Sequence, residues 1–86
     1  MSDDEVYLAV LRKRVREARR QTSLSQEQVA ELADITLRHY QRYEAKTPPG
    51  FNASLMTLRT IGKVLGVDIT HLVQEPSPSE IADIQK

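Results

Sequence analysis

The stretch that most constrains the fold of this chain is SQEQVAELADITLRHYQRYE, which runs from Ser25 to Glu44. Ser25 is a residue type that caps helix starts, and Gln28, three residues later, completes a capping box. Small apolar residues follow at helical spacing. Asp34 then tolerates a positive φ, and Thr36 offers a second N-cap. The stretch therefore predicts two short helices joined by a tight turn.

The second of these helices is expected over residues 37–44. Tyr40 and Tyr43 lie on one side of it at a spacing of three, and we expect both in the core rather than stacked on nucleic-acid bases. Ile35, in the turn, is expected to be a buried pivot. Polar side chains are left on the outer face. Two short helices, a tight turn and a polar outer face are the ingredients of a helix-turn-helix motif.

Other helices flank this motif. Residues 5–21 repeat apolar side chains every three or four positions and predict a first helix, with the first five residues frayed. A Pro-Pro-Gly run predicts a loop over residues 45–53. Ser54 then caps a helix that ends at Gly66, and Asp68 caps a last short helix.

The C-terminal tail permits two interpretations. After a linker rich in proline and serine, residues 79–86 either form a helical turn with Ile81 and Ile84 on one side or remain disordered. The sequence therefore predicts an all-α fold, a compact five-helix bundle. Its helix-turn-helix domain is expected over residues 1–75, followed by a tail over residues 76–86.

Composition limits what such a fold can do. The chain has 86 residues and no cysteine, so an aliphatic core must stabilise it without disulfides or cysteine-bound zinc. Its net charge is zero, but residues 12–66 hold eleven Lys/Arg against five Asp/Glu, while both ends are acidic. Locally concentrated positive charge is what phosphate binding requires.

Several functional classes are disfavoured by the sequence. It has no glycine-rich phosphate loop, no H-x-x-x-H motif and no Ser/His/Asp constellation, so we expect no enzyme and no cofactor. The two histidines, His39 and His71, lack ligand-like spacing, so we expect no metal site. No apolar run reaches the length of a membrane span and the first residues are acidic, so we expect a soluble cytoplasmic protein.

The pattern resembles the Cro/C1-type (XRE-like) helix-turn-helix family of bacterial and phage DNA-binding regulators. The resemblance rests on L-x-x-x-V-R-x-A-R from Leu11, L-S-Q-E-Q-V-A from Leu24, and I-T-x-x-x-Y-x-x-Y-E from Ile35. It continues with S-L-x-T-L-x-x-I-x-x-V-L-G-V from Ser54. This resemblance implies a lambda-repressor-like fold that binds double-stranded DNA.

The second motif helix carries the candidates for reading bases. In this motif it enters the major groove, where its exposed side chains meet base edges. These candidates are Leu37, Arg38, Gln41 and Arg42. Either arginine can make the bidentate contact to guanine, worth about 1–3 kcal/mol of discrimination. Gln41 can read adenine or reach a phosphate, and Leu37 suits a thymine methyl group. The alternative for the arginines is solvated surface charge.

Phosphate contacts are expected at the edges of the motif. Gln26 lies in the first turn of its helix, where free N–H groups favour a phosphate, and the resemblance implies a backbone contact there. Its alternative role is a solvent-facing glutamine in the capping turn. The other candidates are Thr36, Lys46 and Thr47. The weaker ones, better explained as solvated charge, are Arg12, Arg16 and Arg20.

The family resemblance also implies an ion pair between Arg19, near the end of the first helix, and Glu44, which closes the second motif helix. The sequence departs from the family pattern at Asp34, where glycine is usual. Two alanines also replace the usual core leucines, so we expect the space to be filled by Tyr40, Tyr43 or Leu32.

The sequence thus predicts a sequence-specific transcriptional regulator. We expect a repressor that binds a palindromic operator as a homodimer, because one small domain contacts little DNA. The candidate dimer residues are Phe51, Ile81 and Ile84, and core filling is the alternative for Phe51. The competing interpretation is a protein-interaction module, antitoxin-like or scaffold, that keeps the helix-turn-helix fold.

Overall fold

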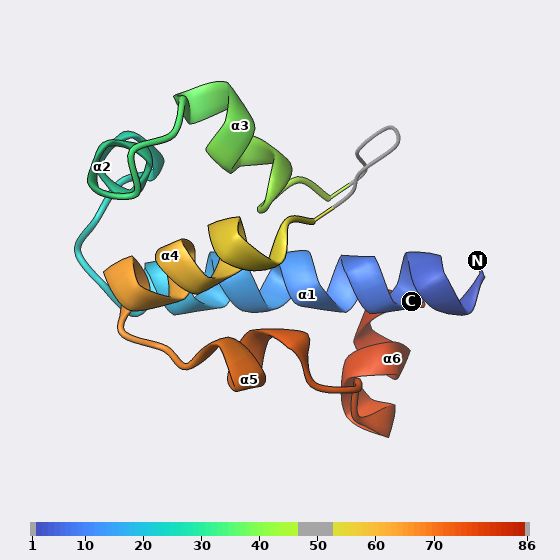
Figure 1. The fold of residues 1–86 in the computed structure, drawn as a ribbon. Coiled ribbons are helices and arrows are strands. Elements are labelled where there is room, and N and C mark those ends of the chain that lie inside the picture. The colour runs from blue at the N-terminus through green and yellow to red at the C-terminus, as the bar shows by residue number, and fades with distance from the viewer. Residues whose placement is uncertain (1, 47–52, 86) are drawn as a thin grey trace.

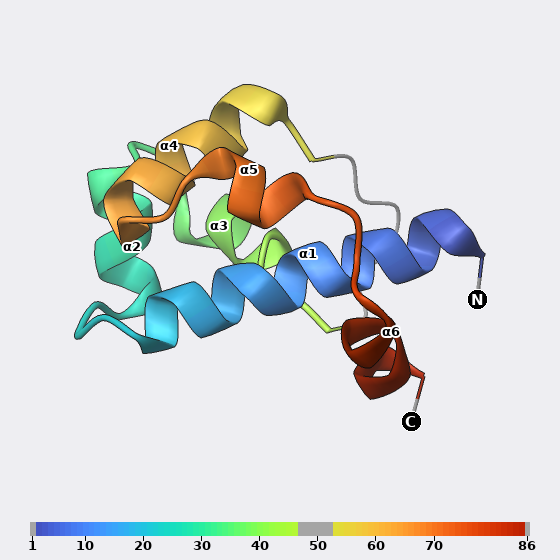
Figure 2. The ribbon, with the colours of Figure 1, turned by 90° about the horizontal axis from the view of Figure 1, so that it is seen from below.

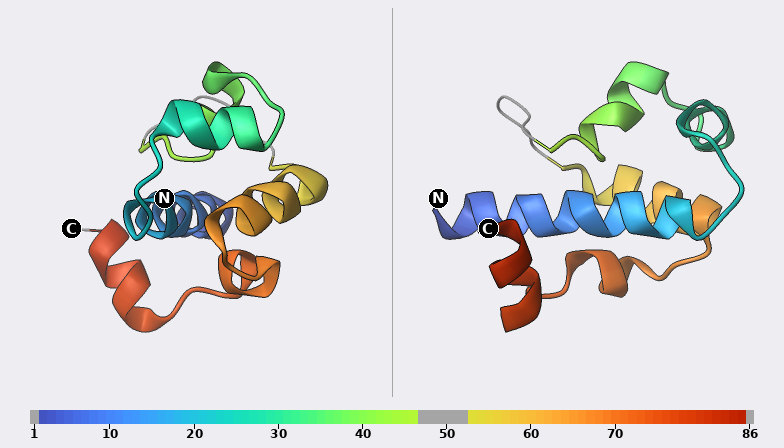
Figure 3. Two further views of the ribbon diagram at one scale, coloured as in Figure 1. Left: turned by 90° about the vertical axis from the view of Figure 1, so that its left-hand side faces the viewer. Right: turned by 180° about the vertical axis from the view of Figure 1, so that it is seen from behind.

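The computed structural model describes residues 2–46 and 53–85. Within these residues it contains no strand and six helices, namely α1 (Asp3–Arg20), α2 (Gln26–Leu32), α3 (Leu37–Arg42), α4 (Leu55–Leu65), α5 (Ile69–Val73) and α6 (Pro78–Ile84). α1 runs through the middle, with α2 and α3 on one side of it and α5 and α6 on the other (Figure 1). Figure 3 shows α4 and α6 on different sides of α1. The all-α fold expected from the sequence is confirmed, with one helix more than the five expected.

α1 begins earlier than the sequence suggested. Ser2 caps it in a reciprocal capping box with Glu5, so residues 2–5 are helical or capping and the expectation that they fray was wrong. Three acidic residues in the first turn and Arg19 and Arg20 in the last turn suit the helix dipole. The side chains that α1 contributes to the core, at spacings of four and three, are Leu11, Val15 and Ala18.

The helix-turn-helix forms as the caps predict. Ser25 and Gln28 make a complete capping box, and the Thr36 side chain accepts a hydrogen bond from the His39 backbone. Asp34 adopts a φ of 57°, the left-handed conformation in which glycine is usual. The Ile35 backbone N–H donates to the Ala30 carbonyl at 3.0 Å, which closes the turn. α3 ends at Arg42, two residues short of the expected Glu44.

Two tyrosines fill the centre of the molecule. Tyr40 and Tyr43 are 0% and 1% exposed and pack with α1 and α4 side chains in one core. Of the three side chains expected to fill the space beside the alanines, these two share the core with Ala18, whereas Leu32 is 62% exposed and does not contribute. Ile35 is only partly buried against this core.

Glycine is required where α4 meets α5. Gly66 caps α4 with a φ of 76°, as the sequence predicts. A Cβ at Gly62 would stand 2.8 Å from the Val67 carbonyl oxygen, so this position of α4 accepts no side chain without a backbone shift. The close approach brings α5, capped by Asp68, back under α4 and α1.

The tail forms α6, the helical alternative of the two that the sequence left open. Ser77 and Glu80 make a capping box, and Pro78 stands in the first turn, where its missing N–H is harmless. α6 buries no residue fully, yet it lies against α1 (Figure 2). The predicted domain boundary at residue 75 stays a prediction.

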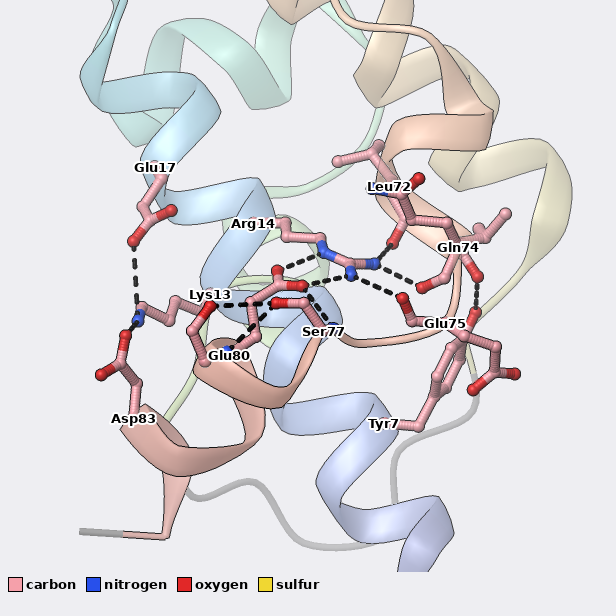
Figure 4. A network of polar contacts seen from close by, with 12 residues as sticks. Tyr7, Lys13, Arg14, Glu17, Leu72, Gln74, Glu75, Ser77, Glu80 and Asp83 are labelled. Carbon is pink, nitrogen blue, oxygen red and sulfur yellow. Dashed lines mark hydrogen bonds and ion pairs between the residues drawn. The ribbon is translucent and has the colours of Figure 1, made fainter.

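Arg14 joins the tail to α1 by charge rather than by apolar packing (Figure 4). Its side chain is 4% exposed, and its Nε and Nη2 atoms donate to the two Glu80 carboxylate oxygens at 2.8 and 2.9 Å. Its remaining hydrogen bonds go to the backbone carbonyls of Leu72, Gln74 and Glu75. All donor groups of the guanidinium are therefore used at the end of α5 and the start of α6.

Two other contacts reinforce this connection. The Tyr7 hydroxyl donates to the Val73 carbonyl, and Lys13 lies 3.0 Å from the Asp83 carboxylate. The Arg14 guanidinium, followed by the Ser77 backbone N–H, lowers the pKa of Glu80 to about 2.

We predict that Glu80→Gln lowers the free energy of unfolding at pH 7 by about 1–3 kcal/mol. Because the pKa of Glu80 is lowered in the folded state, the stabilisation is complete above the ordinary carboxyl pKa of 4.5 and disappears as the pH falls to about 2. Urea unfolding at several pH values measures the difference from the unmodified chain. Asp83→Asn is the control, since an exposed pair contributes at most about 1 kcal/mol. A difference that stays constant down to pH 2 would contradict this account.

Candidate nucleic-acid interface

The outer face of α3 is polar and accessible. Because Tyr40 and Tyr43 point into the core, the helical period turns Arg38, Gln41 and Arg42 to solvent, and all three are exposed. Within the described residues neither arginine forms an ion pair. Two guanidiniums four residues apart are therefore available from one helix.

The other side chains of α3, and those just before and after it, lie around this face. Leu37 is half-buried, so only part of it is available to a ligand. His39 is exposed, and its ring stacks on Tyr43 with centroids 5.6 Å apart and planes 4° from parallel. Thr36 is exposed while its hydroxyl caps the helix. Lys46 is exposed after α3, whereas Thr47 and Phe51 lie outside the described residues.

Gln26 links α2 to α3, which the sequence did not reveal. Its Nε2 donates to the Glu44 carboxylate at 3.0 Å, and its Oε1 accepts from Gln41 Nε2 at 3.3 Å. The side chain is half-buried rather than a free surface amide. Gln26 and Gln41 therefore form one continuous polar surface between the two helices.

The Glu44 carboxylate is the centre of the network below this surface. Its side chain is 3% exposed, and Arg19 donates to both its oxygens, at 2.7 Å from Nε and 3.2 Å from Nη2. The Tyr40 hydroxyl and Gln26 complete its set of donors. Burial alone would raise the pKa of Glu44, but these hydrogen bonds outweigh it and lower the pKa. Glu44 is therefore ionised at neutral pH. The pKa of Tyr40 is raised, first by its burial and then by its hydrogen bond to the Glu44 carboxylate.

The arginines of α1 differ from the sequence expectation. Arg12 is 6% exposed, so its interpretation as solvated charge or a phosphate contact was wrong. Arg16 is half-buried, and its Nη1 donates to the Glu44 backbone carbonyl at 2.6 Å. This hydrogen bond gives a partner to a carbonyl group just after the end of α3. Arg20 alone of the three is exposed. α1 therefore uses most of its positive charge to hold other elements.

The part of the chain that the structure describes offers little for other chemistry. No group of three or more His, Cys, Asp or Glu residues there is arranged to hold a metal ion. No helix within the same residues has the length and apolar character to cross a membrane.

We predict that Glu44→Ala lowers the free energy of unfolding by about 3–5 kcal/mol, because it leaves the Arg19, Tyr40 and Gln26 donors without their buried acceptor. Thermal unfolding measures the loss. Glu31→Ala, an exposed carboxylate on α2, is the matched control and should change stability by less than about 0.5 kcal/mol. An unchanged melting temperature for Glu44→Ala would refute the role given to this carboxylate.

Comparison with known families agrees with this arrangement. The model of a helix-turn-helix family matches residues 15–72, more than half of the chain. The matched range begins after Arg14 and ends before α6, so the contacts between Arg14 and Glu80 lie outside it. No curated protein and no solved structure matches the chain. The resemblance found in the sequence is thus confirmed, and the chain belongs to the Cro/C1-type helix-turn-helix family of non-enzymatic DNA-binding domains.

Proposed function

We propose that the chain is a sequence-specific transcriptional regulator that binds double-stranded DNA with α3 in the major groove. The observation that carries this proposal is the exposure of Arg38, Gln41 and Arg42 on a helix held rigidly by a buried carboxylate. A helix backbone that is already formed and anchored loses little conformational entropy on binding, which favours discrimination between bases. A regulator of this kind acts in the cytoplasm.

The roles of the side chains follow from their chemistry. Arg38 and Arg42 make bidentate contacts to guanine, and Gln41 reads adenine. Leu37, being half-buried, presents an edge to a thymine methyl group. The phosphate contacts come from the borders of the motif, at Gln26, Thr36, Lys46 and Thr47.

The proposed regulator acts as a homodimer on a palindromic operator and represses by occluding a promoter. A single domain buries only about 600–1,000 Å² on DNA, and two copies double this contact by symmetry. Of the dimer residues suggested by the sequence, Ile81 and Ile84 are half-buried on α6, and Ile81 lines a small cavity with Val6 and Tyr7 of its own α1. This placement leaves them less surface for a second subunit.

A protein-interaction module is the second candidate. Two exposed apolar side chains, Leu55 at 64% and Met56 at 61%, favour it because such side chains often mark protein contacts. The acidic ends of the chain agree with it as well. Affinity for DNA separates the candidates, since the interaction module has no reason to select one duplex over another.

Selection of bound duplexes from a random pool tests the proposal. We expect one palindromic sequence to be enriched, and Arg38→Ala or Arg42→Ala to weaken binding to it by about 1–3 kcal/mol and relax preference at one position. Arg38→Lys is the matched control, because it keeps the charge and loses the bidentate contact. It should retain nonspecific affinity and lose discrimination.

Phosphate contacts give a different signature. Lys46→Ala should weaken binding about equally on all sequences and reduce the slope of log affinity against log salt by about one. Equal, weak binding to every duplex in the pool would exclude the sequence-specific regulator and favour the interaction module.

A further inference from the structure

An apolar groove lies between α1 and α4, away from the polar face of α3. It encloses about 290 Å³ and is lined by Tyr7, Leu8, Leu11, Ala53, Leu55, Leu58 and Val73. Leu55, one of these lining residues, is 64% exposed, and the next residue of α4, Met56, is 61% exposed. Contiguous apolar surface of this kind is costly in water and marks a contact site.

Charges of opposite sign stand at the two ends of this groove. At one end α1 begins with the exposed Asp3 and Asp4, and Asp4 shares a helix face with Leu8 and Leu11 at spacings of four and seven. At the other end α4 continues from Leu55 to the exposed Arg59 and Lys63, at spacings of four and eight. Within the described residues, none of these four charged side chains has an ion-pair partner.

α1 and α4 run in the same sense along the molecule, from right to left in Figure 1, and Figure 2 shows that they lie closer together at their C-terminal ends than at the start of α4. Along this direction come, in order, the acidic start of α1, the apolar groove, and Arg59 and Lys63 of α4. The exposed Asp68 lines one hollow with Arg59 and Lys63, which leaves one net positive charge at that end. A half-turn about an axis through the apolar centre reverses this order. Acid then meets base at both ends while the groove meets itself, which is the self-complementarity that a symmetric dimer requires.

We infer that this groove is the surface on which a second copy of the chain docks, with Asp4 of each copy facing Arg59 of the other. The inference rests on the dimer of the proposed function and gives it an interface. The half-turn axis points from α1 towards α3, upright in Figure 1, so both α3 helices stay on one side of the dimer. Two helices facing one duplex are what a palindromic operator needs.

The tail takes no part in this contact. α6 lies on another side of α1 than α4, and it is held there by Arg14 and Lys13 (Figures 3 and 4). A dimer through Ile81 and Ile84 would therefore use a different flank and would not bring Leu55, Met56 and Arg59 together with Asp4.

Charge reversal in the full chain, without DNA, tests this interface. Asp4→Arg places like charges against Arg59 of the other copy, and Arg59→Glu places like charges against Asp4. We expect each variant to raise the dimer dissociation constant at least about tenfold in sedimentation velocity, since each reverses two contacts. An equimolar mixture of the two variants should recover association, because the mixed dimer regains opposite charges at both contacts.

The matched control is Arg42→Glu, the same charge change on α3, which should leave self-association unchanged. A chain that stays monomeric at all concentrations overturns the inference. So does a mixture that fails to recover, or dissociation caused by Ile81→Glu but not by Arg59→Glu.

DNA selectivity is measured separately, on the same proteins. If the chain binds DNA selectively but Arg59→Glu does not change its dimer dissociation constant, this interface is wrong and the proposed regulator is still supported. If the mixture recovers self-association but no variant or unmodified chain binds DNA selectively, the interface is supported and the proposed regulator is excluded.

Discussion

The buried carboxylate of Glu44 is the constraint on which the helix-turn-helix depends. Its donors come from three helices, Arg19 on α1, Gln26 on α2 and Tyr40 on α3. A buried ionised group is expensive unless it is fully hydrogen-bonded, and here each carboxylate oxygen accepts at least two hydrogen bonds. The position of α2 against α3 is therefore held by this one charge as well as by the turn hydrogen bond from Ile35 to Ala30.

α1 connects this motif to the rest of the molecule with two sets of arginine contacts. Towards the motif, Arg16 and Arg19 bind the backbone and side chain of Glu44. Towards the tail, Arg14 binds Glu80 and the carbonyls that end α5. The apolar face of α1 packs the core between them. A count of basic residues in the sequence assigns this positive charge to phosphate binding, but much of it is used in contacts within the protein.

What the sequence predicted well is local. Helix caps and left-handed residues are determined by neighbours a few positions away, so they can be predicted from the sequence alone. This holds for the caps at Ser25, Thr36, Ser54 and Asp68 and for the left-handed residue Asp34. The resemblance to a known family then supplied the pairing of Arg19 with Glu44, which spacing alone does not show.

What the sequence missed depends on distant partners. Arg14 looks like its neighbours Arg12 and Arg16, and its acceptors stand 58 to 66 positions away. The tail has few apolar residues, so the sequence left open whether it is helical, and nothing local shows that Arg14 and Lys13 pair with it. The Ser77-x-x-Glu80 capping box is the local signal that could have revealed α6, whereas no local signal marks Arg14 as its partner.

The Glu44 network also sets the chemistry of the surface above it. A carboxylate only accepts, so Gln26 must turn its NH₂ group towards Glu44, and its carbonyl oxygen then faces Gln41. Gln41 in turn must point its own NH₂ group at Gln26. It keeps its carbonyl oxygen and one N–H for the outside, and this acceptor and donor are the two groups with which a glutamine matches adenine in the major groove. The same buried charge that holds α3 in place thus decides which way the Gln41 amide faces.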